Sequence, residues 1–284
     1  MGINDNLQVA VIGAGPAGLF AAETLADKGF GVALFNRDIK PGGLAEYGIF
    51  PDKYKMKNGL RNQFKQILNS EKIAYYGNIH VGVENCLGVP TLFEWGFDAI
   101  LITCGAQGVK SLHLPGEELL GVVNAKDLVF NYNRLPPFSL ARYQFGRKVV
   151  IVGAGNVMAD IAHYLIKYTK TEEITVVIRR GPGEVKFDKK EMVYIISYVG
   201  QKEFDQEMLR VSGEMLKIGQ DPNAAKEAIL AALPKADPKY REALIKFHFL
   251  SSPTRIIADK TGKIVMGIEL EENSLVLADG EIPK

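Results

Sequence analysis

Residues 7–37 have the sequence LQVAVIGAGPAGLFAAETLADKGFGVALFNR, and this stretch decides the fold of the 284-residue chain. Residues 7–12 indicate a buried parallel strand, residues 19–29 a helix that stops at Gly29, and residues 30–35 a second strand. Between strand and helix, Gly13 permits a tight turn, Gly15 lets backbone approach a pyrophosphate, and Gly18 lets the helix pack closely. The pattern predicts a dinucleotide cradle at the positive end of the helix; a turn that serves packing alone is the alternative.

The same pattern returns in residues 147–168, RKVVIVGAGNVMADIAHYLIKY. Gly153 and Gly155 follow a strand at 149–152, and Ala159 takes the place of the third glycine, which a small side chain can do. The next expected strand, EITVVI, ends in Arg179 and Arg180, where an NAD-preferring site has a carboxylate. Because a guanidinium matches the geometry of a phosphate monoester, this cradle is predicted to select NADP(H). The alternative is a solvated basic corner.

These two units predict an α/β protein with two Rossmann-like dinucleotide-binding domains of three-layer ββα character. The first domain is expected at 1–105 and the second at 106–284. The rest of the second domain should form its wall and insertions, with helical patterns after Asp221-Pro222 and Asp237-Pro238 (the latter at 239–247). Two strands are expected around the Lys-Thr-Gly-Lys turn at 260–263.

Composition excludes several classes of protein. A net charge of +1 favours neither nucleic acid nor a membrane surface as a partner. Two cysteines without a CxxC pair disfavour a disulfide scaffold, a zinc ribbon and a dithiol centre, and the four histidines lack metal-ligand spacing. No apolar run reaches membrane-spanning length and no secretory signal pattern opens the chain, so a cytoplasmic location is expected.

One position departs from the dinucleotide pattern. The end of the second strand usually carries an acidic residue that grips ribose hydroxyls, and here it is Asn36. A carboxamide accepts hydrogen bonds more weakly than a carboxylate. We therefore expect a weaker first site, and tighter binding if Asn36 is replaced by glutamate.

Several segments together resemble the adrenodoxin reductase type of ferredoxin–NADP reductase, within the glutamate-synthase-like flavoprotein group. The likeness covers almost the whole chain. The most specific of the similar segments is RRGPGEVKFDKKE at 179–191. The others are VIGAGPAG for the FAD turn, GLAEYGIFPDKYKMKN at 43–58, YGNIHVG at 76–82, LPGEELLGV at 114–122, GAGNV for the NADP turn and FLSSPTRII at 249–257.

The resemblance implies an oxidoreductase in which NADPH gives hydride to FAD and electrons pass singly to a ferredoxin-type iron–sulfur protein. No catalytic side chain is expected, since the cofactor carries the chemistry. With the glycine turns, the resemblance predicts FAD contacts at Gly13, Gly15, Pro16, Ala17, Gly18, Asn36, Arg37, Gly43, Leu44, Gly48, Val81 and Gly105. It predicts NADP(H) contacts at Gly153, Ala154, Gly155, Asn156, Val157, Arg179, Arg180 and Glu191.

The chain also departs from the family. Lys53 stands where many members have the histidine of Pro-Asp-His. The family's return to the FAD domain, with its Gly-Trp segment, is expected to be missing, because no tryptophan follows Trp95. Two other functions therefore stay open: the electron-input subunit of a glutamate-synthase-like complex, and a non-catalytic NADP(H)-binding subunit or sensor. A ferredoxin could dock on the lysines at 53, 55 and 57 or at 186, 189 and 190, or these could be plain solvated surface.

Overall fold

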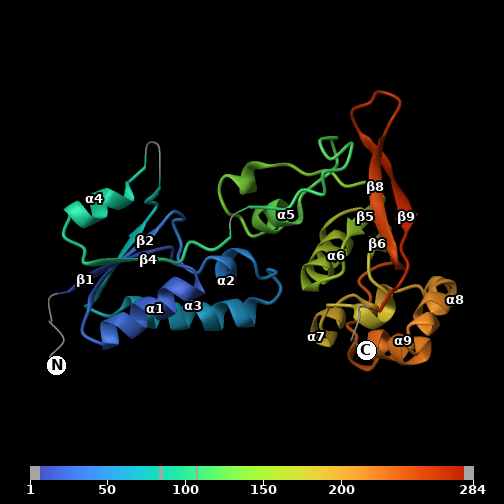
Figure 1. Ribbon diagram of the computed structural model, residues 1–284, viewed down its shortest axis with the longest axis horizontal. Coiled ribbons are helices and arrows are strands. Elements are labelled where there is room, and N and C mark those ends of the chain that lie inside the picture. The colour runs from blue at the N-terminus through green and yellow to red at the C-terminus, as the bar shows by residue number, and fades with distance from the viewer. Residues whose placement is uncertain (1–6, 83–85, 107, 278–284) are drawn as a thin grey trace. The chain divides into compact units, whose positions relative to one another are not determined.

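The computed structural model describes residues 7–82, 86–106 and 108–277. The chain divides into two compact units (Figure 1). The first comprises residues 1–110 and 126–141, and the second comprises residues 111–125 and 142–284. The sequence placed a single boundary after residue 105; the structure differs in that the segment 126–141 lies with the first unit.

The first unit is built on a four-stranded parallel sheet with the order β3-β2-β1-β4. Its strands are β1 (Gln8–Ile12), β2 (Gly31–Asn36), β3 (Ile73–Gly77) and β4 (Ala99–Ile102). The order reverses between β1 and β4, because the chain leaves β1 in one direction and later returns on its other side. In open parallel sheets a ligand crevice forms at the carboxyl ends of the strands at such a reversal.

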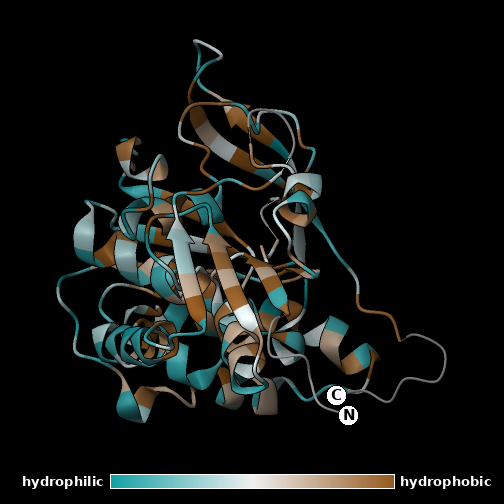
Figure 2. Cartoon of the chain, turned by 90° about the vertical axis from the view of Figure 1, so that its left-hand side faces the viewer, coloured by the Kyte–Doolittle hydropathy of each residue, from teal (hydrophilic) through white to brown (hydrophobic). Residues whose placement is uncertain are grey.

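Helices cover both faces of this sheet. Helices α1 (Pro16–Asp27) and α3 (Tyr54–Leu68) cover one face and α4 (Val89–Glu94) the other. The helices α2 (Leu44–Tyr47) and α5 (Ala125–Tyr132) complete the helices of this part of the chain. Alternate residues of β1 point to opposite faces, so Val9 and Val11 pack with Leu19 of α1 and Phe64 of α3, while the other face packs with Leu92 of α4. Apolar residues, brown in Figure 2, follow the strands between the helical layers.

The second unit has a three-stranded parallel sheet with the order β5-β6-β7. Its strands are β5 (Lys148–Val152), β6 (Glu173–Val177) and β7 (Leu244–His248). The helical pattern predicted at 239–247 is wrong, because residues 244–248 pair with β6 along their whole length. Ile245 and Phe247 are buried, whereas Leu244, Lys246 and His248 are half-buried, which is the alternation of a strand.

The remaining elements of the second unit surround this sheet. They are α6 (Asn156–Tyr168), α7 (Lys189–Met192), α8 (Gln201–Lys217), α9 (Pro222–Leu230), short 3₁₀ turns at 182–184, 196–198 and 233–235, and an antiparallel pair, β8 (Ser251–Ala258) with β9 (Val265–Glu272). Asp221 caps α9 by accepting the N–H of Asn223 at 2.8 Å, as its Asp-Pro start predicts. The predicted hairpin around 260–263 is confirmed. Of the described helices, none combines the length and the apolar character needed to cross a membrane.

Candidate functional site

The first glycine turn joins the carboxyl end of β1 to α1 as the sequence predicts. Gly13 has φ +109°, and its N–H donates to the carbonyl of Phe35 at 2.8 Å. At Gly18 a Cβ would lie 1.9 Å from the carbonyl oxygen of Gly13, so only glycine lets α1 approach the turn this closely. A Cβ at Gly15 would meet no atom within 4 Å, which leaves open space above the turn.

The start of α1 presents amide donors to that space. Gly15 is the N-cap and supplies no side-chain acceptor, and Pro16 has no N–H. Helix geometry leaves the N–H groups of Ala17 and Gly18 without an intrahelical acceptor. The predicted contacts at 15–18 therefore lie together at a helix N-terminus suited to an anion.

Sequence reasoning missed Thr103, which follows β4. Its hydroxyl donates to the carbonyls of Gly13 at 2.8 Å and Ile12 at 3.1 Å. These contacts fix the turn against β4 at the point where the strand order reverses. Gly105, a predicted contact, follows at φ +69° and is exposed. The available signal was a threonine at the start of the small residues that follow the strand, Thr103 to Ala106.

Asn36 lies at the end of β2 but its side chain faces the protein. Only 7% of the residue is exposed. Its Oδ1 accepts the N–H of Ala14 at 3.1 Å, and its Nδ2 donates to the carbonyls of Asp38 at 2.7 Å and Lys40 at 3.2 Å. The neighbouring Arg37 is exposed and pairs with Asp38 at 3.1 Å. Asn36 thus braces the glycine turn, and its contact with a ribose stays a prediction.

The loop at 41–48 lies directly beside the first turn. The N–H of Gly42 donates to the carbonyl of Ala14 at 2.7 Å, and a Cβ at Gly43 (φ +50°) would be 2.9 Å from the Cα of Gly15. Leu44, 64% exposed, then begins the short helix α2, which Gly48 caps. Val81, by contrast, packs on the apolar cluster at the α4 face, and its contact with a cofactor stays a prediction.

Buried charges hold α2 in place. Glu46, 6% exposed, accepts both Nε and Nη2 of Arg61 at 2.7 and 2.6 Å, and these hydrogen bonds hold the pKa of Glu46 below its usual range. Lys57 donates from Nζ to Oδ1 of Asn133 at 2.8 Å, and burial lowers the pKa of Lys57. Asn133 in turn donates to the carbonyl of Tyr47 at 2.9 Å. Lys57 is therefore buried and is not part of a basic surface cluster with Lys53 and Lys55.

The second glycine turn has the same geometry at the end of β5. Gly153 has φ +103° and donates to the carbonyl of Val177 at 2.8 Å. No atom lies within 4 Å of a Cβ built at Gly153 or Gly155, so backbone is open to a ligand. Gly155 is the N-cap of α6, which leaves the N–H groups of Asn156 and Val157 without an intrahelical acceptor. Ala159 is buried and its methyl is accommodated.

Arg179 and Arg180 follow β6, beginning two residues after Val177, which anchors this turn. Both are exposed, and neither guanidinium makes a hydrogen bond or ion pair with any residue that the structure describes. Their backbone is held instead: the carbonyl of Arg179 accepts Nδ2 of Asn273 at 3.1 Å, and that of Arg180 accepts the N–H of Leu250 at 3.2 Å. The pair is thus anchored at the main chain with both cationic ends toward solvent.

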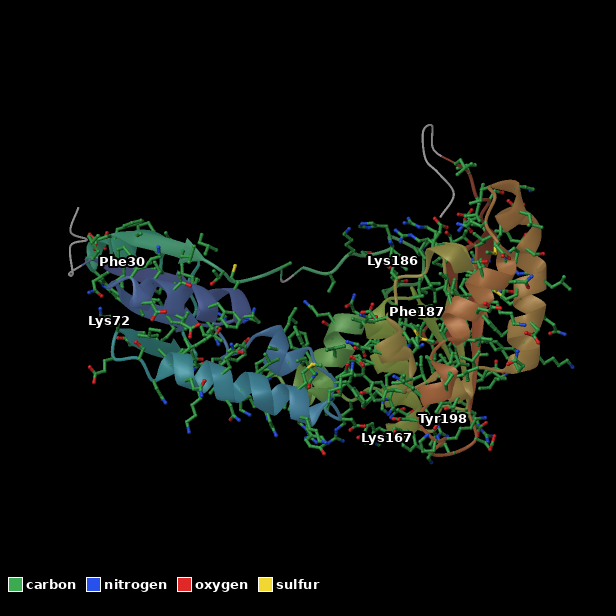
Figure 3. The ribbon with its side chains drawn as sticks, turned by 90° about the horizontal axis from the view of Figure 1, so that it is seen from below. Phe30, Lys72, Lys167, Lys186, Phe187 and Tyr198 are labelled. Atoms are coloured by element: carbon green, nitrogen blue, oxygen red, sulfur yellow. The ribbon has the colours of Figure 1, made fainter. Side chains whose placement is uncertain are left out.

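The basic segment after the arginines is tied back to the second turn. Asn156 donates from Nδ2 to Oδ2 of Asp188, and the N–H of Asp188 donates to Oδ1 of Asn156, both at 2.8 Å. Phe187 (Figure 3) stacks on Phe247 of β7 with ring centroids 6.2 Å apart, whereas its neighbour Lys186 is exposed. The structure therefore brings the predicted stretches 153–157 and 179–191 together, with Glu191 on α7 just beyond Asp188.

A cavity of about 710 Å³ opens elsewhere in the second unit, at the amino ends of β6 and β7. Its lining includes Glu172, Tyr198, Lys239 and Leu244. Nucleotides bind parallel sheets at the opposite, carboxyl ends of the strands. We therefore place the candidate site at the two glycine turns and not in this cavity.

Comparison with known proteins gives one family. The model of the pyridine nucleotide-disulphide oxidoreductases matches residues 7–203. The chain is 29% identical over 299 residues to mitochondrial NADPH:adrenodoxin oxidoreductase of Mus musculus, covering 94% of this chain and 60% of that protein. It is 28% identical over 309 residues to NADPH-ferredoxin reductase FprA of Mycobacterium leprae, covering 95% and 64%.

A solved structure has a similar fold. FprA of Mycobacterium tuberculosis in complex with NADPH superposes with a TM-score of 0.78 at 25% identity, over 97% of this chain and 65% of that one. The chain thus spans about three fifths of the length of the curated relatives it matches. The α/β fold and the predicted resemblance to ferredoxin reductases of the adrenodoxin reductase type are confirmed.

Proposed function

This chain belongs to the pyridine nucleotide-disulphide oxidoreductase family, and we propose that it is an NADPH-dependent flavoprotein reductase that serves a ferredoxin-type iron–sulfur protein. FAD, when bound, would take hydride from NADPH and pass electrons singly to that partner. The observation that carries the proposal is the exposed Arg179–Arg180 pair beside an open glycine turn.

The residues of the first cradle fit the diphosphate of FAD. A diphosphate carries negative charge, and the N–H groups of Ala17 and Gly18 point from a helix N-terminus into open space above Gly15. Gly43 lies against Gly15, so backbone and not side chains would line the ligand there. The role of the chain is to bind and orient the cofactor with main-chain donors that need no rearrangement.

The residues of the second cradle fit NADP(H) better than NADH. The amides of Asn156 and Val157 would hold the diphosphate, and the two guanidiniums would hold the 2′-phosphate. In the first cradle the corresponding strand end is occupied by Asn36, whose amide is fully engaged with protein groups. The two glycine-turn sites therefore differ at the end of the second strand, which is where the ribose of a bound nucleotide, with or without its 2′-phosphate, would lie.

The proposal is tested with the chain as it stands. Purified protein is incubated with FAD, desalted and examined for flavin absorbance, and then mixed anaerobically with NADPH or NADH. We expect retained flavin that NADPH bleaches faster than NADH, followed by reduction of an added ferredoxin. A protein that binds NADPH but retains no flavin would contradict the enzyme and support the binding-only subunit.

A further inference from the structure

We propose that Asn273 is a positioning residue for 2′-phosphate selectivity in the second cradle. The inference rests on the proposed NADP(H) function and adds a residue that lies 94 positions from Arg179 in the chain. Asn273 follows β9, outside both glycine turns and outside the segment 179–191.

Both hydrogens of the Asn273 side-chain amide are used, one toward the arginine turn and one toward β8. Nδ2 donates to the carbonyl of Arg179 at 3.1 Å and to the hydroxyl oxygen of Ser252 at 2.9 Å. The backbone N–H of Asn273 donates to the carbonyl of Leu250 at 2.7 Å, and the N–H of Leu250 donates to the carbonyl of Arg180. The main chain of both arginines is therefore held by residues 250 and 273 together.

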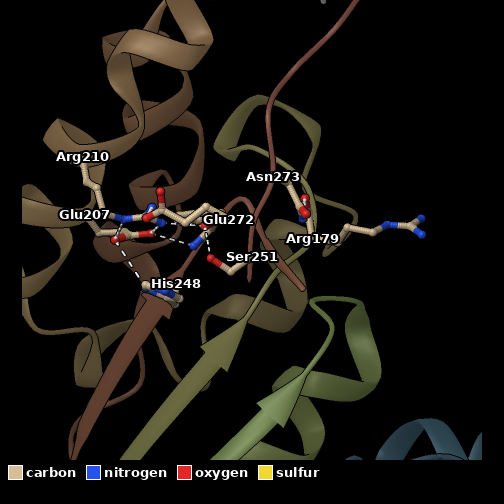
Figure 4. A network of polar contacts seen from close by, with 8 residues as sticks. Arg179, Glu207, Arg210, His248, Ser251, Glu272 and Asn273 are labelled. Carbon is tan, nitrogen blue, oxygen red and sulfur yellow. Dashed lines mark hydrogen bonds and ion pairs between the residues drawn. The ribbon is translucent and has the colours of Figure 1, made fainter. Parts of the chain in front are cut away.

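An ion pair fixes the loop from which these contacts are made (Figure 4). Glu207 is 8% exposed and accepts Arg210 at 2.7 Å. The carboxylate of Glu207 also accepts the N–H of Phe249 at 2.6 Å, and Nη2 of Arg210 donates to the carbonyl of Phe249 at 2.6 Å. Both polar groups of the Phe249 main chain are thus clamped.

The clamp explains why Leu250 can adopt an unfavourable conformation. Its φ is +49°, a region that a leucine enters only where its surroundings hold it there. In that conformation its N–H reaches Arg180 and its carbonyl accepts the N–H of Asn273. Arg210 also forms an ion pair at 3.1 Å with Glu272, the residue before Asn273. The Arg210 side chain therefore holds both the Phe249–Leu250 segment and the Glu272–Asn273 segment.

Selectivity depends on this anchoring because the guanidiniums have no described partner of their own. Two long exposed side chains recognise a phosphate well only if their main chain is already in place, since otherwise binding must order it. Losing the Asn273 amide should therefore weaken a ligand with a 2′-phosphate more than one without it. In Figure 4 the Arg179 side chain extends away from Asn273, so the contact runs through the backbone alone.

The experiment compares 2′,5′-ADP with 5′-AMP by calorimetry, so it needs neither flavin nor turnover. We expect wild type to prefer 2′,5′-ADP and Asn273→Ala to lose about threefold to tenfold of that preference, with 5′-AMP unchanged. Asn273→Asp has the same shape without the donor and should lose the preference as well. Asn223→Ala, at an exposed asparagine of the same unit, is the control. Thermal unfolding checks that each variant is folded.

The outcomes separate the inference from the proposed function. If wild type prefers 2′,5′-ADP and the Asn273 variants keep the full preference, the inference is overturned and the proposed function stands. Equal weakening of both ligands would show a merely structural role and overturn it too. If wild type itself shows no preference, the NADP(H) assignment fails and the inference fails with it.

Discussion

The side chain of Asn36 accepts the backbone N–H of Ala14 at 3.1 Å, so the end of β2 is bonded directly to the first glycine turn. The same amide donates to the carbonyls of Asp38 and Lys40. One neutral side chain thus both accepts and donates, which a carboxylate cannot do. This changes what a substitution at position 36 is expected to do.

Asn36→Glu should destabilise the first unit despite the stronger acceptor that it introduces. The carboxylate would face the partly buried carbonyls of Asp38 and Lys40, whose donor is gone, at about 1 kcal/mol for each lost hydrogen bond. We expect a lower thermal midpoint and less retained flavin, measured by calorimetry and by the flavin-to-protein ratio. Asn62→Glu, at an exposed position of α3, is the control. Tighter FAD binding at unchanged stability would instead support the ribose contact inferred from the sequence.

Gly18→Ala should lower the stability of the first unit, because α1 could no longer pack closely against the glycine turn. Its methyl carbon would lie 1.9 Å from the Gly13 carbonyl and 2.7 Å from the Thr103 hydroxyl, so we expect a loss of about 3 kcal/mol or more. Gly59→Ala is the matched control, because no atom lies within 4 Å of that position on α3, and a gain of about 0.4–1 kcal/mol is expected. Urea unfolding measures both. Similar midpoints for the two variants would show that close packing at Gly18 is unimportant.

Replacing Arg179 and Arg180 together by alanine should remove the preference for NADPH. Each lost charged hydrogen bond is worth about 1.5–3 kcal/mol, so NADPH should weaken by at least roughly tenfold while NADH changes little. Equilibrium binding of both nucleotides provides the measurement. Arg255→Ala, which removes an exposed ion pair with Glu269 on the hairpin, controls for the loss of charge. Equal loss for both nucleotides would refute the 2′-phosphate role.

The Glu46–Arg61 pair should make the first unit sensitive to acid. Arg61 lowers the pKa of Glu46 below its ordinary value of 4.5, so the stabilisation is fully present above that value. It is lost as the pH falls through the lower pKa of the folded state. Glu46→Gln should therefore be less stable than wild type at pH 7, with a gap that closes in acid. Urea midpoints across this range, with exposed Glu71→Gln as control, measure it; a gap independent of pH would contradict the linkage.

The two glycine turns were predictable because their determinants are local. Gly13, Gly15 and Gly18 lie within six residues; a Cβ at Gly13 or Gly18 would clash with nearby backbone, and Gly15 leaves the space above the turn open. The arginines were predictable for the same reason, since their distance from Gly153 along a strand–helix–strand unit is short. Local chemistry of this kind is visible in a single sequence.

The sequence could not show which residues, distant in the chain, would contact a given side chain or strand. Lys57 seemed to belong to a surface cluster, but Asn133, which binds it, is 76 positions away. Residues 239–247 are rich in helix formers, which is why a helix was predicted there. Residues 244–248 form a strand instead, because they pair with β6 and bury the alternate side chains of Ile245 and Phe247. Asn273 carries no local signal at all.

The hydrogen bond between Asn273 and Arg179 also has a consequence for biosynthesis. Every described segment of the first unit has left the ribosome's catalytic centre once residue 141 is made, whereas the arginine turn must wait for residue 273. At about 5–20 residues per second the interval is on the order of ten seconds. A nascent chain therefore completes the segments of its first glycine turn before the arginine turn can be anchored, so for that time the first unit can fold while the second is still being made.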